Sequence, residues 1–166
     1  ARTVWVSPAY GSILSTVLDN AGWPRSIGSA SEPSEADEGG ESVVSSSWDR
    51  DNASATLDVL EIGADLLEVV AVARDEAIDR GARYIDLHLP VGKPEAAGVD
   101  LLALGFSYAA FLPETGPDGD ILLLQWLADR EVDRGHWHLA NPDLEALDDA
   151  IIAQAVEATG GREPQQ

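Results

Sequence analysis

Apolar residues recur along this chain with two different periods, and the two periods alternate. A period of two residues, which places alternate side chains on one face of a strand, marks residues 56–62 and 84–89. A period of three to four residues, which gives a helix one apolar stripe, marks residues 8–21 and 66–79. The alternation predicts a mixed α/β (α+β) domain in which helices connect strands.

Two hairpins are predicted where turn-forming residues separate strand patterns. The polar run Asp-Arg-Asp-Asn at 49–52 separates a strand at 43–44 from the strand over 56–62. A second hairpin joins residues 107–114 to residues 119–127. Helices between consecutive strands imply crossover connections, so we expect part of the sheet to be parallel.

The chain is expected to form one domain over residues 1–139, with a helix over 140–160 packed on it and a frayed tail at 161–166. Within the domain, residues 26–41 are rich in Ser, Glu, Gly and Pro and contain almost no large apolar side chain. That composition predicts an acidic, mobile loop.

Charge narrows the classes of partner. The 30 acidic and 10 basic residues give a net charge of −20, which repels nucleic acid phosphates and anionic lipid headgroups, so we expect neither as a partner.

The longest apolar runs, such as 121–124, are too short to cross a bilayer. The absence of cysteine is compatible with a cytoplasmic protein, which is our expectation. An acidic excess with Lys93 as the single lysine fits a halophilic source as well as an ordinary acidic protein.

Histidines supply the other candidate chemistry. His136 and His138 alternate in a segment with nearby carboxylates, but their spacing is not specific and favours a surface loop, so no metal site is expected. His88 shares a strand face with Asp86, which gives either an oriented base or a satisfied histidine under a helix.

The order of elements over residues 82–127 resembles the C-terminal half of the GNAT acyltransferase fold. Leu104-Gly105-Phe106 is similar to the junction that closes the fourth helix of that family, and the hairpin that follows resembles its last two strands. The likeness in element order covers residues 42–128 and, less closely, residues 1–27. It implies a mixed, mostly antiparallel twisted sheet with helices on both faces, including a helix that ends at Gly105.

The resemblance implies a co-substrate, acetyl-CoA or another acyl-CoA, which in this family binds where two adjacent parallel strands splay apart. Its pyrophosphate rests on backbone N–H groups at the start of the helix after the fourth strand, a position held here by Ile62, Gly63 and Ala64. Asp65 follows at once and is expected to cap that helix, with its carboxylate at the same N–H groups.

Catalytic roles also follow from the resemblance. Glu61 is the candidate general base that deprotonates an amine of a small molecule or protein, and Tyr108, or alternatively Tyr84, is the candidate donor of a proton to the leaving thiolate. Leu101 stands where many family members carry that tyrosine.

Three hypotheses therefore stay open. The first is a divergent GNAT-like, acyl-CoA-dependent N-acyltransferase. The second is a GNAT-fold module that has lost catalysis and serves binding or regulation. The third is an oligomerisation module that uses exposed tryptophans as anchors, with these candidates: Trp5, Trp23, Trp126 and Trp137. A homodimer and a fusion to other domains are both compatible with the sequence.

Overall fold

The computed structural model describes residues 2–28, 40–117, 119–129 and 144–160. Its helices are α1 (Pro8–Ala21), α2 (Leu66–Asp79) and α3 (Glu145–Gly160), with two short 3-10 helices, η1 (Pro94–Gly98) and η2 (Leu102–Leu104). Its strands are β1 (Arg2–Trp5), β2 (Arg25–Gly28), β3 (Val43–Asp49), β4 (Ser54–Glu61), β5 (Tyr84–Pro90), β6 (Ser107–Gly116) and β7 (Gly119–Leu127).

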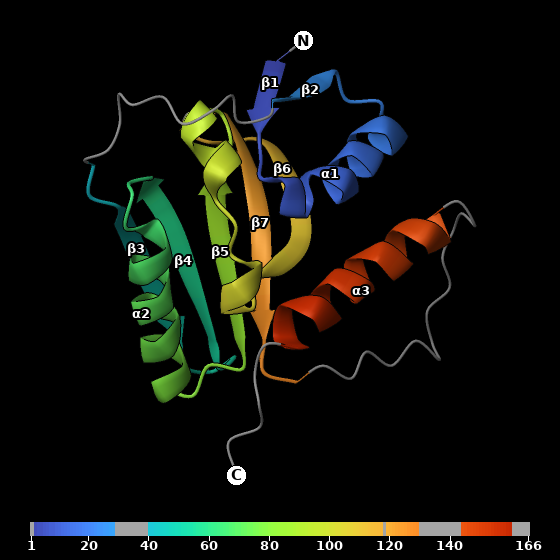
Figure 1. Ribbon diagram of the computed structural model, residues 1–166. Helices are drawn as coiled ribbons and strands as arrows, with labels where there is room; N and C mark the ends of the chain where they lie inside the picture. The colour runs from blue at the N-terminus through green and yellow to red at the C-terminus, as the bar shows by residue number, and fades with distance from the viewer. Residues whose placement is uncertain (1, 29–39, 118, 130–143, 161–166) are drawn as a thin grey trace.

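Five strands form one mixed sheet in the order β3-β4-β5-β7-β6 (Figure 1). Strands β4 and β5 run parallel, and the other neighbours run antiparallel. The mostly antiparallel α+β sheet, both predicted hairpins and the partly parallel pairing are therefore confirmed. Strands β1 and β2 form a separate parallel pair, which the Trp5 N–H joins to the end of β5 by donating to the Val91 carbonyl at 2.8 Å.

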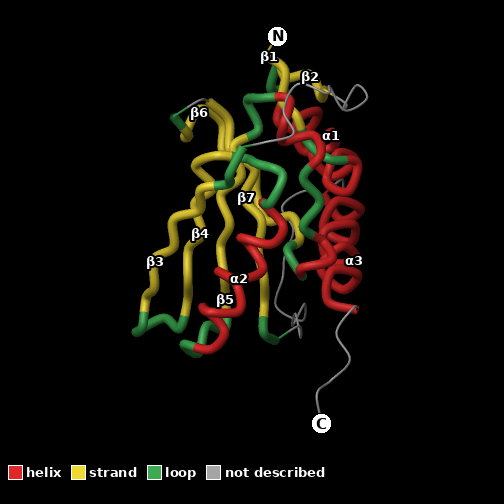
Figure 2. The backbone as a smooth tube through the Cα atoms, turned by 60° about the vertical axis from the view of Figure 1, so that its left-hand side comes forward, coloured by secondary structure: helices red, strands yellow, loops and turns green. Residues whose placement is uncertain are grey.

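The three α-helices all pack on one face of this sheet, so the expectation of helices on both faces is wrong for the described residues. Figure 2 shows α1 and α3 together on one side of the five-stranded sheet. Side chains from α1 and α2 share a single buried cluster with Leu57, Leu87 and Leu124, which are neighbours across three strands, and residues of α3 pack against it. On β4 and β5 the strand pattern agrees with this: positions between these leucines, such as Asp58 and Asp86, are polar, so the other face of these two strands has little apolar surface to bury.

The predicted crossover helix before Gly105 is also wrong, because η1 and η2 take its place. Gly98 is a weak helix former, and Val99 after it is extended at φ −85° and ψ 106°. The Asp100 carboxylate then accepts a hydrogen bond from the Leu102 N–H at 3.0 Å. This local turn competes with a continuous helix, so the apolar run breaks in two.

Strand β2 corrects the start of the predicted acidic loop, since Ser26, Ile27 and Gly28 pair with β1. Residues 29–39 of that loop lie outside the described residues. The strand is held by Arg25, whose guanidinium Nε lies 2.7 Å from a carboxylate oxygen of the buried Asp120 on β7. Burial alone raises the pKa of Asp120, but hydrogen bonds from Arg25 and from the Glu114 N–H, with the nearby arginine charges, outweigh it and leave that pKa below its ordinary value.

One buried side chain of helix α3, Gln154, bonds the helix to two other elements. The Gln154 amide nitrogen donates to the Ala9 carbonyl of α1 at 2.6 Å, and its amide oxygen accepts from the Tyr108 N–H of β6 at 2.8 Å. Among the described residues, no helix has both the length and the apolar character needed to cross a bilayer.

Candidate functional site

The start of α2, where the resemblance implies a pyrophosphate site, is filled by another part of the same chain. The Gly63 N–H donates to the Ser42 hydroxyl oxygen at 2.8 Å. The Ser42 N–H in turn donates to a carboxylate oxygen of Asp65 at 2.8 Å. Ser42 therefore uses the first N–H group that a bound phosphate oxygen would need.

Gly63 is required at this position by packing within the chain. A Cβ atom added there would lie 2.1 Å from the Gly40 carbonyl oxygen and 2.8 Å from the Ser42 nitrogen. Only glycine lets the segment 40–42 approach this closely. The close approach that the resemblance assigns to a ligand is made here by the protein's own backbone.

Asp65 does not cap α2, contrary to expectation. It stands at the N-cap position, but its side chain makes no hydrogen bond to the helix N–H groups, and its backbone, at φ −92° and ψ 9°, is not extended. Hydrogen bonds from the Ser42 hydroxyl and backbone N–H hold the pKa of the Asp65 carboxyl below its ordinary value. The Asp65 carboxylate therefore bonds to Ser42, 23 residues earlier in the chain, and not to the N–H groups of its own helix.

Next to the contact of Ser42 with Gly63 and Asp65, strands β4 and β5 separate. Their pairing ends at Asp58 and His88, although β4 continues to Glu61 and β5 to Pro90. A small hollow of about 80 Å³ lies at the separated ends and is lined by Leu60, Glu61, Ile62, Pro90, Lys93 and Glu95. Pockets that bury a whole small-molecule ligand measure roughly 300–1,000 Å³, so this hollow has room for only part of one. Its two carboxylates outnumber its single ammonium group, so its lining does not favour an anionic ligand.

The two candidate catalytic residues are not brought together. Glu61 is exposed at the end of β4, whereas Tyr108 is buried on β6, three strand spacings away in the sheet. Three spacings amount to roughly 14 Å, which is far beyond hydrogen-bond distance. Burial raises the pKa of Tyr108 to about 12. Tyr84, the alternative, is half-buried on β5, and burial followed by its bond to Asp86 raises its pKa.

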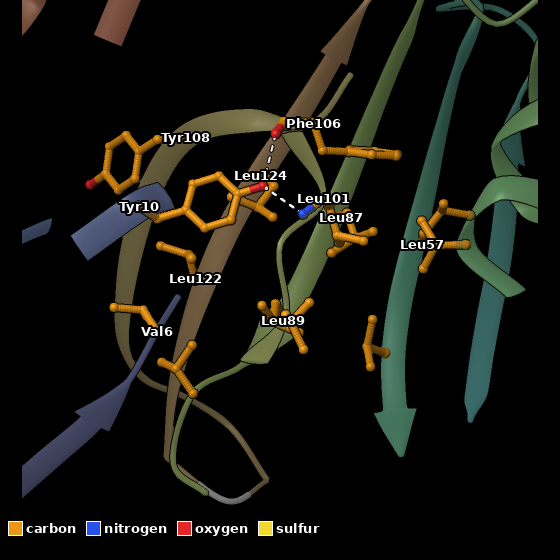
Figure 3. Close-up of a cluster of buried hydrophobic side chains, with 14 of the residues drawn as sticks. Val6, Tyr10, Leu57, Leu87, Leu89, Leu101, Phe106, Tyr108, Leu122 and Leu124 are labelled. Atoms are coloured by element: carbon orange, nitrogen blue, oxygen red, sulfur yellow. Dashed lines mark hydrogen bonds between the residues drawn. The ribbon is translucent and has the colours of Figure 1, made fainter. Parts of the chain in front are cut away.

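Leu101 has a fully buried side chain, and a tyrosine from α1 reaches its backbone instead. The Tyr10 hydroxyl accepts from the Leu101 N–H at 3.2 Å and donates to the Phe106 carbonyl at 2.9 Å (Figure 3). Tyr10 has no exposed surface, and burial is the main cause that raises its pKa. This hydroxyl closes the turn around Gly105, and its burial keeps it out of reach of a substrate.

His88 has a partner that the sequence did not indicate. Its Nδ1 lies 2.6 Å from a carboxylate oxygen of Asp58 on the neighbouring strand, rather than beside Asp86 on its own strand. Both side chains are partly exposed on the sheet face opposite the helices. The strand register places them directly opposite each other, and only a correct prediction of the β4–β5 register would have found this pair.

The other candidates are the tryptophans expected as exposed anchors and the histidines of residues 136–138. Trp126 is only 3% exposed and belongs to the core, so its expected role as an exposed anchor is wrong. Trp23 is 38% exposed and its ring lies 5.8 Å from that of Phe111. His136, Trp137 and His138 lie outside the described residues. Within the part of the chain that the structure describes, no group of three or more His, Asp or Glu side chains is placed to hold a metal ion.

Comparison with protein-family models, with curated proteins and with solved structures gave no match. The functional argument therefore depends on the geometry of this chain.

Proposed function

We propose that this chain is a GNAT-like domain that does not transfer acyl groups and acts as a binding or regulatory module. The adjacent parallel strands β4 and β5, with separated ends and a helix that follows β4, support the likeness to that fold. The main support for the absence of acyl transfer is the contact at Gly63. Its N–H is bonded to Ser42, and the Gly40 backbone lies against the same glycine, where a pyrophosphate would otherwise bind.

Electrostatics agree with this proposal. The hollow beside the helix start presents Glu61 and Glu95 against Lys93, and the whole chain carries a net charge of −20. CoA is a polyanion, so its approach is unfavourable unless salt screens the repulsion. Helix N-terminal N–H groups offset such repulsion in anion sites, but here the glycine N–H is already used.

Calorimetric titration with CoA and with acetyl-CoA tests the proposal. We expect no binding heat at millimolar ligand, either at about 0.15 M or at about 1 M salt, where the Debye length falls from roughly 8 to 3 Å. Saturable binding of either ligand to the wild-type chain contradicts the proposal.

An active acyl-CoA-dependent N-acyltransferase is the second candidate, favoured by the hollow at the separated strand ends with Glu61 at its rim. Acyl transfer to a panel of small-molecule and peptide amines measures it. If Glu61 is the general base, Glu61→Gln abolishes transfer, whereas Glu95→Gln, which removes the same charge from the same hollow, retains it. Transfer that survives Glu61→Gln excludes that role for Glu61.

A further inference from the structure

We draw no further inference here: the strongest candidate, the polar face of β4 and β5 with Asp58, Asp86 and His88, lies on the side of the sheet opposite the helices, and nothing in the structure shows what covers it.

Discussion

The start of α2 and the turn from Leu101 to Phe106 are both closed by a hydroxyl group from a distant part of the chain, but at different depths. At α2, the Ser42 hydroxyl is partly exposed and accepts from the Gly63 N–H. At the turn, the Tyr10 hydroxyl is fully buried and bonds to both Leu101 and Phe106. A buried N–H or C=O that loses its partner has no water to replace it, whereas a partly exposed group does.

The difference separates two ways in which polar groups serve the fold. Both positions that the resemblance connects with acyl transfer use their polar groups for contacts within the chain. The turn around Leu101 depends on its bonds for stability, so a mutation there is expected to reduce folding first. The start of α2 is closed by groups that water can replace, so a mutation there is expected to leave the fold in place.

The largest effect is expected at the buried turn. Tyr10→Phe removes the hydroxyl and leaves the Leu101 N–H and the Phe106 carbonyl without this partner. At about 1–3 kcal/mol for each of the two unsatisfied buried groups, the free energy of unfolding should fall by roughly 2–6 kcal/mol in urea denaturation. Tyr84→Phe is the matched control, because Tyr84 is half-buried, and its loss is expected to be smaller. Equal losses in the two variants would show that the depth of the hydroxyl does not matter.

A smaller effect is expected at Gly63. Gly63→Ala places a methyl group 2.1 Å from the Gly40 carbonyl oxygen, so the segment 40–42 must move away from α2. We expect a loss of about 1–2 kcal/mol in the free energy of unfolding, since overpacking costs about 1–3 kcal/mol and this site is partly exposed. Gly98→Ala is the control, because a Cβ at Gly98 meets no atom within 4 Å. The idea that 40–42 closes this site fails if both variants unfold at the same urea concentration.

Local patterns in the sequence predicted the elements, and contacts between distant residues decided the sites. The strand alternation and the polar turn at 49–52 were sufficient for the β3–β4 hairpin, and the alternation over 56–58 and 84–88 also indicates that one face of these two strands is polar. By contrast, the bonds that close the two compared regions join residues 91 and 21 positions apart. Nothing in the residue types of Tyr10 or Ser42 indicates those partners, because serine and tyrosine hydroxyls accept hydrogen bonds in many surroundings.

The smallest effect, and the most specific one, is expected for the carboxyl group at the start of α2. The pKa of Asp65 is lowered in the folded chain by its bonds from Ser42, so these bonds stabilise the fold above the unfolded aspartate pKa of about 3.9. That stabilisation is lost as the pH falls through the lowered folded value. In Ser42→Ala, which removes the hydroxyl bond, the Asp65 pKa should move up towards its ordinary value, as a carboxyl-carbon NMR titration would measure. The stability difference between wild type and Ser42→Ala should then shrink below about pH 4, because the carboxylate becomes protonated in both. An Asp65 pKa that Ser42→Ala leaves unchanged would mean that the Ser42 hydroxyl does not hold this carboxylate.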